Sequence, residues 1–445
     1  MRVVDIGATE LRAAFARRLS TMYAGEVPAY RTLVEVASEI NLEVLAAQGS
    51  AAERLGSIAR VTEERHGAIR VGTRSELRQV GDLFAAMGMS PVGFYDLRDA
   101  GPAAVPVVST AFRPVEPAEL AANPFRVFVS VLATDDRRFF PAELQDEVER
   151  FLARRTLFPP ELMELAGRAE ADGGLDEVAA TRFLDLATAA FELSPDPVDR
   201  SWYDRLERVS SVAADIGGVG STHINHLTPR VLDIDELYAR MQRRGIEMID
   251  EIQGPPRVEG PAVLLRQTSF RALAEPRTFR ATDGTVEQGA LRVRFGEVES
   301  RGVALTPAGR DRYDATGVED LPRTERDLAV ADLAYYTVTT VPDRRRDDRA
   351  PDRDLATLVD DGWVELEPIV YEDFLPRSAA GIFRSNLAVD TESDRSQDGS
   401  HRDAAWIEAA LDRPVHDLFG LYAGQRDESV GQALRTLGVV TGATT

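Results

Sequence analysis

The chain has 445 residues, 44% of them hydrophobic and 28% charged, which is enough for two or three domains around a sizeable core. Its formal net charge of −22 opposes binding to nucleic acid or to an anionic membrane, because both require clustered cationic side chains. The absence of cysteine excludes disulfides, zinc–thiolate sites and iron–sulfur clusters. The first residues lack the apolar core of a signal peptide, and no run of 18 apolar residues follows, so we expect a soluble cytoplasmic protein.

Two regions carry apolar residues at helical spacing. They are residues 8–50 and residues from about 136 to 214, where Pro and Gly stand at the expected helix ends. The predicted organisation is N-terminal helices over 1–60, a first module over 61–134, a helical insertion over 135–215, a second module over 216–305, and a mixed C-terminal region over 306–445.

The two modules share the predicted order β-α-β-β-β. The first begins with the strand-like "HGAIRVGT" and the helix "SELRQVGDLFAAMG", followed by "VGFYDLRD", "VPVVSTAFRPV" and "FRVFVSVLA". The second begins with "HINHLTPRV" and "DIDELYARMQRRG", followed by "IEMIDEIQG", "AVLLRQTSFRAL" and "ALRVRFGEVES". Unless the similarity is coincidental, it indicates two copies of one unit packed against each other.

The spacing to the glycine that closes each helix aligns the two modules. His66 precedes Gly88 by 22 residues, and His223 precedes Gly245 by the same number. His66 and His223 are therefore matched, whereas His226 would give a spacing of 19. Since side chains alternate along a strand, His223 and His226 should point to opposite faces. We expect His223 to be the ligand and His226 to support the site or belong to the core.

A third ligand is expected from the last strand of a module. In the second module this strand offers Glu297 and Glu299, which lie on one face, so alternation does not choose between them. The matched positions in the first module are Val131 and Ala133, which supply no carboxylate. Two histidines and one carboxylate leave three positions open on Fe(II) for substrate and dioxygen. A glutamate from each module would instead suit Lewis-acid chemistry.

Two arginines are candidate substrate contacts. Arg70 follows His66 by four residues and could bind a substrate carboxylate through two hydrogen bonds, or be a surface arginine at a strand end. Arg377 lies in "RSAAGIFRSN", which could form an anion-binding wall or a plain turn. His401 and His416 are interpreted as structural.

Four motifs together resemble the 2-oxoadipate dioxygenase/decarboxylase family, also called hydroxyglutarate synthases, of the vicinal oxygen chelate superfamily. They are "ERHGAIRVGT", "STHINHLTPRVLDID", "VESRGVALTPAGRDRYD" and "FLPRSAAGIFRSNL", and the similarity runs from about residue 10 to residue 430. The resemblance implies an Fe(II) enzyme of lysine breakdown that converts 2-oxoadipate and O2 to 2-hydroxyglutarate and CO2. It implies His66, His223 and Glu299 as ligands, with Glu299 favoured because the family's glutamate stands two residues before the Arg-Gly pair.

The resemblance also implies that Arg70 binds a substrate carboxylate, with Arg377 as the candidate for a further contact. The expected fold is α+β, with two βαβββ modules of the vicinal-oxygen-chelate type forming a central curved sheet or barrel. Two alternatives remain. One is a metal-dependent isomerase or lyase of the same superfamily, against which the missing first-module carboxylate counts. The other is a non-catalytic protein that binds small molecules.

Overall fold

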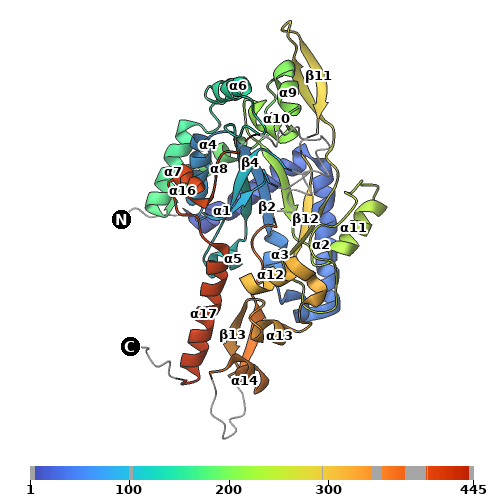
Figure 1. Ribbon diagram of the computed structural model, residues 1–445, viewed down its shortest axis with the longest axis vertical. Helices are drawn as coiled ribbons and strands as arrows, with labels where there is room; N and C mark the ends of the chain where they lie inside the picture. The colour runs from blue at the N-terminus through green and yellow to red at the C-terminus, as the bar shows by residue number, and fades with distance from the viewer. Residues whose placement is uncertain are drawn as a thin grey trace.

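The computed structural model describes residues 6–99, 104–292, 294–342, 353–375, 397 and 399–439. Two hydrophobic cores organise them. The larger core joins the N-terminal helices, the main sheet and the inserted helices. The smaller core lies in the C-terminal part, in the lower half of Figure 1, where α17 (Leu418–Thr436) runs beside strand β13 (Tyr336–Thr340).

The main sheet has five strands in the order β3-β4-β5-β2-β8. The β2–β5 pair is parallel, whereas the other pairs are antiparallel. Nearly every residue of these strands is buried, so both faces of the sheet are covered, as their β-branched and aromatic composition indicates. The bounds are β2 (Arg65–Val71), β3 (Ser90–Asp96), β4 (Val107–Arg113), β5 (Arg126–Leu132) and β8 (Ile224–Pro229).

A second pair of strands extends this arrangement beside β8. Strand β9 (Leu265–Ser269) pairs antiparallel with β12 (Glu297–Arg301). Strand β12 meets the end of β8, where Val231 N donates to Glu299 O at 2.8 Å. This contact places Glu297 and Glu299 of β12 beside β8, at the edge of the main sheet.

Several helices begin directly after a residue whose side chain caps the helix N-terminus. Helix α4 (Arg74–Ala85) begins with a capping box formed by Thr73 and Glu76, and α11 (Ile234–Arg243) is capped by Asp233. The other described helices that precede β8 in the chain, and α16 after it, are α1 (Ala8–Glu26), α2 (Pro28–Gln48), α3 (Ile58–Glu63), α5 (Pro117–Ala122), α6 (Ala142–Leu152), α7 (Pro160–Asp172), α8 (Glu177–Ala189), α9 (Arg200–Glu207), α10 (Ser211–Gly217) and α16 (Ala404–Leu411).

The remaining elements are short. Strands β1 (Ile6–Gly7) and β6 (Gly174–Leu175) pair with each other, and β14 (Val364–Pro368) pairs with β13. The C-terminal helices are α12 (Pro307–Thr316), α13 (Glu325–Val330) and α14 (Leu355–Asp360), and the single-turn helices cover Gly49–Glu53 and Val318–Asp320.

The second module departs from its predicted strands. Residues 246–254 form only isolated bridges, at Met248 and Gln253, instead of a strand. The predicted strand over 290–300 is divided between β11 (Val286–Leu291) and β12. Strand β11 forms a hairpin with β10 (Glu275–Arg280) that projects at the top of Figure 1 and meets β7 (Val198–Asp199). The mixed α+β class is confirmed, whereas the closed two-module barrel stays a prediction.

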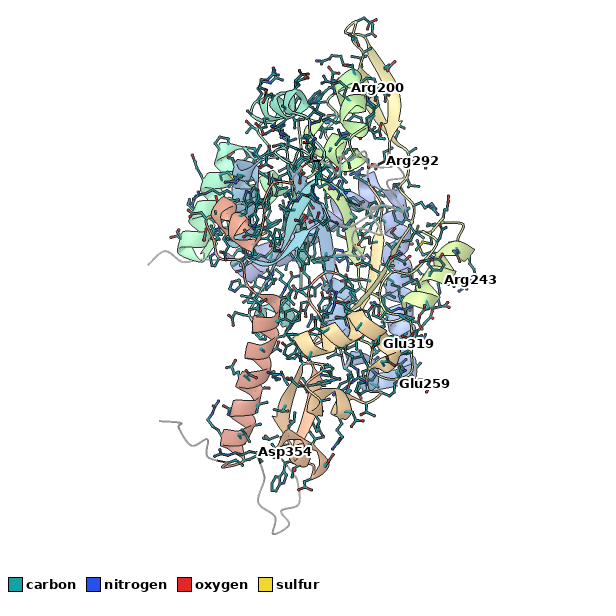
Figure 2. All side chains as sticks on the ribbon, in the orientation of Figure 1. Arg200, Arg243, Glu259, Arg292, Glu319 and Asp354 are labelled. Carbon is teal, nitrogen blue, oxygen red and sulfur yellow. The ribbon has the colours of Figure 1, made fainter. Side chains whose placement is uncertain are left out.

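The surface is dominated by charged side chains, several of which are labelled in Figure 2, such as Arg243 on α11 and Asp354 before α14. All 52 cationic side chains are arginine, because the sequence contains no lysine. Within the described residues, no helix is both long and apolar enough to cross a membrane.

Candidate metal centre

Three buried side chains from three strands converge beside the edge of the main sheet. They are His66 on β2, His226 on β8 and Glu297 on β12, and one ligand atom of each lies within 4.8 Å of the others. Glu297 Oε2 lies 3.3 Å from His66 Nε2, and Glu297 Oε1 lies 3.4 Å from His226 Nδ1. Among the described residues, these are the three candidate ligand side chains that lie close enough together to hold a metal ion.

The register of the sheet explains why His66 and His226 meet. In the antiparallel β2–β8 pair, Ala68 stands opposite His226 and His66 stands opposite Thr228. Paired residues project to the same side of a sheet, as do residues two apart on one strand, so His66 and His226 share a face. Their rings pack edge to face, with centroids 5.4 Å apart.

His66 lies between two glutamates. Its Nδ1 is 2.7 Å from Glu299 Oε2, while its Nε2 faces Glu297. Burial opposes a charge on the imidazole, yet the neighbouring Glu299 and Glu297 carboxylates raise the pKa of His66. A neutral His66 with its proton on Nδ1, beside Glu299, would direct its Nε2 lone pair at Glu297 and His226, the orientation that a metal-binding histidine requires.

Glu299 belongs to a buried ionic cluster, which we call the arginine cluster. Arg301 donates to both Glu299 oxygens, at 2.7 and 2.9 Å. Although burial alone would raise it, Arg301 and His66 hold the pKa of Glu299 far below its ordinary value. The cluster comprises Arg60, Glu64, Arg126, Arg230, Glu299, Arg301 and Glu372.

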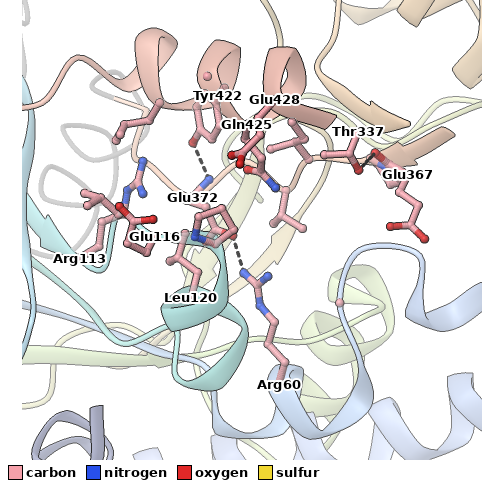
Figure 3. A pocket seen from close by; sticks show the side chains of 18 of the residues that line it. Arg60, Arg113, Glu116, Leu120, Thr337, Glu367, Glu372, Tyr422, Gln425 and Glu428 are labelled. Carbon is pink, nitrogen blue, oxygen red and sulfur yellow. Dashed lines mark hydrogen bonds and ion pairs between the residues drawn. The ribbon is translucent and has the colours of Figure 1, made fainter. Parts of the chain in front are cut away.

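One side of the arginine cluster lines a cavity of about 540 Å³ (Figure 3). Arg60 forms an ion pair with Glu372 there, and the Glu372 backbone N–H donates to Tyr422 Oη at 2.8 Å. Neither histidine of the candidate centre lines this cavity. The cavity therefore borders the support of the centre, not the centre itself.

Aromatic rings also pack on the histidines of the candidate centre. The Phe374 ring packs edge to face on His66, with centroids 5.1 Å apart, and on Phe128 at the same distance. The Phe295 ring lies 5.3 Å from His226. Burial lowers the pKa of His226 to about 4, so its imidazole is neutral at pH 7. Such a dry, neutral nitrogen is suited to bind a metal ion.

The predicted ligand His223 lies in a different environment. Its Nε2 is 3.3 Å from Asp215 Oδ1 and 3.1 Å from Asn225 Nδ2. Asp215, on α10, also accepts a hydrogen bond from Arg70 Nη1 at 2.5 Å. Arg70 is thus a buried residue of β2, not a surface arginine.

The group that the structure brings together therefore differs from the predicted ligand set of His66, His223 and Glu299. It contains His226 and Glu297, which the sequence analysis treated as a supporting residue and as the less favoured alternative. Glu299 contacts the far nitrogen of His66. Arg377 lies outside the described residues. Asp215 was not identified from the sequence.

A different count would have selected His226. Thr73, which caps α4, follows His66 by seven residues, and Asp233, which caps α11, follows His226 by seven. The closing glycines are 15 residues after Thr73 but only 12 after Asp233. The second helical segment is three residues shorter, so alignment on its glycine moved the match by three positions, from His226 to His223.

The donor set fits a divalent transition metal. Two imidazole nitrogens and one carboxylate form the two-histidine, one-carboxylate arrangement typical of non-haem iron sites with open positions. The Nδ1 atoms of His66, His223 and His226 are all buried without a hydrogen-bond partner in the described structure, and among them Nδ1 of His226 is the one that faces Glu297. The coarser prediction, a metal site made of two histidines and a glutamate, is supported by these side chains.

Comparison with known proteins gives the family. The sequence profile of the 2-oxoadipate dioxygenase/decarboxylase family matches residues 15–386. The chain is 57% identical to the 2-oxoadipate dioxygenase/decarboxylase of Mycobacterium bovis, over 93% of this chain and 95% of the relative. It is 42% identical to the protein of the same name in Escherichia coli K12, over 96% and 98%.

Solved structures agree. The hydroxyglutarate synthase of Pseudomonas putida, crystallised in complex with 2-oxoadipate, superposes with a TM-score of 0.83 at 36% identity, over 98% of this chain and 100% of that one. A glyoxalase-superfamily protein from Ralstonia eutropha shares the fold more distantly, with a TM-score of 0.51 at 20% identity over 66% of this chain and 84% of that one. From the profile and the full-length relatives together, we conclude that this chain belongs to the 2-oxoadipate dioxygenase/decarboxylase family.

Proposed function

We propose that this chain is an Fe(II)-dependent enzyme that converts 2-oxoadipate and O2 to 2-hydroxyglutarate and CO2, with His66, His226 and Glu297 as the iron ligands. The observation that carries the proposal is the buried convergence of these three side chains in a chain of this family. Bound iron would supply open positions for a chelating 2-oxo acid and for dioxygen, whose reduction would draw its electrons from the 2-oxo acid.

The surrounding residues have separable tasks in this proposal. Glu299 accepts the proton of His66 Nδ1 and so directs Nε2 toward the metal, while Arg301 fixes Glu299 through two hydrogen bonds. Phe374 and Phe295 exclude water from the imidazoles. Arg70 would bind the distal carboxylate of the substrate, with Asp215 holding one of its nitrogens in place.

Oxygen uptake tests the reaction. The protein is reconstituted anaerobically with Fe(II), then mixed with oxygenated buffer containing 2-oxoadipate, 2-oxoglutarate or no substrate. We expect stoichiometric O2 consumption and CO2 release with 2-oxoadipate. Absence of uptake with any 2-oxo acid would refute the reaction and favour the oxygen-independent isomerase or lyase alternative.

Iron content tests the ligands. The histidines three residues apart provide a matched pair: His226→Ala should lose bound iron, whereas His223→Ala should retain it. The opposite result, with iron lost only in His223→Ala, would restore the ligand predicted from the sequence. Metal analysis after desalting gives this answer independently of activity.

A further inference from the structure

We propose that the cavity between α6, α9 and β10 is an anion-binding vestibule through which the dicarboxylate substrate reaches the metal centre. This inference rests on the proposed function. The cavity has a volume of about 800 Å³, and Gly218–Ser221, which connects Asp215 to His223, forms part of its lining. It is distinct from the cavity beside Arg60.

Four arginines line the vestibule, namely Arg150, Arg154, Arg277 and Arg280. None of them forms an ion pair with a carboxylate in the part of the chain that the structure describes. Arginines elsewhere in the protein are extensively paired, for example in the arginine cluster. These four charges are thus available to an incoming anion.

The acidic residues of the same lining are largely engaged. Glu147 is held by both terminal nitrogens of Arg205, at 2.7 and 3.0 Å. Asp199 caps α9 by accepting from Ser201 Oγ and from the Trp202 N–H. The lining thus holds four arginines against the three carboxylates of Glu147, Asp196 and Asp199, a positive balance in a protein whose net charge is −22. Such a patch raises the local concentration of a dianion that the rest of the surface repels.

Arg277 marks the inner end of the vestibule. Its side chain is 6% exposed, and one terminal nitrogen donates to the Ser194 carbonyl. Its Nε is buried without a hydrogen-bond partner in the described structure. A buried donor without an acceptor is costly, and a carboxylate of the ligand would satisfy it. Burial lowers the pKa of Arg277, and Asp215 is the carboxylate that offsets this effect most.

Asp215 connects the vestibule to the metal centre. Its charge acts on Arg277 of the vestibule lining, and it accepts a hydrogen bond from Arg70 Nη1 at 2.5 Å. Arg70 and the ligand His66 lie on the same strand, four residues apart. Asp215 thus interacts with a guanidinium that lines the vestibule and with one on the strand that carries His66.

The connecting segment is tightly built. A side chain at Gly218 would place its Cβ 2.5 Å from the Ala214 carbonyl oxygen and 2.9 Å from Tyr203, so only glycine fits there. The wall beside it is apolar, since the Phe151 and Trp202 rings pack there with centroids 5.9 Å apart and planes tilted by 37°. An apolar wall next to two arginines suits a methylene chain with a carboxylate at each end.

Charge reversal at the exposed mouth tests the vestibule. We compare the iron-loaded double variant R154E/R280E with R31E/R312E, which makes the same change of net charge at exposed arginines outside the vestibule. At low ionic strength, kcat/KM for 2-oxoadipate should fall about 10-fold or more in R154E/R280E, with kcat unchanged at saturation. The deficit should shrink in about 0.5 M salt, because exposed charges are screened. The control should stay within about 2-fold of the unmodified protein.

The inner subsite needs a measurement besides turnover. Calorimetric titration of the metal-free protein with 2-oxoadipate should show binding about 10-fold or more weaker in R277Q than in the unmodified protein, with an unchanged unfolding temperature. If the unmodified protein is active, either of two results would refute the vestibule. One is equal affinity of R277Q and the unmodified protein for 2-oxoadipate, and the other is equal salt dependence of kcat/KM in R154E/R280E and R31E/R312E. An inactive unmodified protein that still binds iron would instead refute the proposed function.

Discussion

Glu297 and Glu299 lie two residues apart on one strand and contact the same histidine, yet their surroundings are opposite. Glu299 is bound by Arg301 and lies in the arginine cluster, so its charge is neutralised. Glu297 forms no ion pair with an arginine in the described structure, and its oxygens face His66 and His226. The difference is what the proposed ligand assignment requires: the oxygens of Glu297 have no guanidinium partner in the described structure, whereas those of Glu299 are bound by Arg301.

The largest effect should come from Glu297→Gln. The amide removes the only charge of the ligand set, so iron should be lost and turnover should fall by about 1000-fold or more. Iron analysis and O2 uptake measure both. Full iron occupancy in this variant would overturn the assignment of Glu297.

Removal of one carboxylate from the arginine cluster should mainly affect stability. Glu64 is 2.8 Å from Arg126 and 2.9 Å from Arg230, and all three are fully buried or nearly so. Glu64→Gln leaves buried cations uncompensated and should lower the free energy of unfolding by roughly 3–5 kcal/mol. Denaturant unfolding measures this, with exposed Glu365→Gln as the control. Equal stabilities of the two variants would contradict it.

Low pH should weaken the arginine cluster by protonating its carboxylates. Although burial opposes ionisation, Arg60 and Arg126 lower the pKa of Glu372 to about 2, from an ordinary value of 4.5. A lowered carboxyl pKa stabilises the fold above pH 4.5, and this contribution, roughly 3 kcal/mol, is lost as the pH falls toward 2. Thermal unfolding between pH 7 and pH 2.5 should show a steep decline only below about pH 4.5. A decline already complete at pH 5.5 would assign the effect to other groups.

The smallest effect should come from Glu299→Gln. The amide oxygen can still accept from His66 Nδ1, so iron should bind with an affinity reduced by about 10–100-fold. Competition with a chelator gives the ratio of affinities. Loss of iron equal to that of Glu297→Gln would remove the distinction between the two glutamates.

Much of the fold could be predicted from the sequence, because strands of the main sheet and capped helices such as α4 carry local signals. His66, the carboxylate-bearing strand β12 and the family were also predicted. The prediction of His223 rests on the glycine after α11, which reports the length of a helical segment and not the position of the preceding strand, whereas the buried group contains His226. The hairpin of β10 and β11 was missed because its residues join a separate small sheet with β7.

The role of Asp215 could not be predicted from the residues that surround it in the sequence. It lies on α10 in the helical insertion, 145 positions after Arg70, and only the folded chain brings the two side chains together. Likewise, nothing in the spacing of Glu297 and Glu299 separates them. Their difference comes from arginines around Glu299, namely Arg301 on the same strand and Arg126 on β5.

The arginine cluster has a consequence at the other end of the pH scale. A lysine-based cluster would begin to lose its charges near pH 10, but guanidinium groups keep theirs in strongly alkaline solution. Because the sequence contains no lysine, the α-amino group is its only primary amine. Amine-reactive dyes or supports should therefore attach at a single point, the N-terminus, and leave the buried cluster and the vestibule arginines chemically untouched.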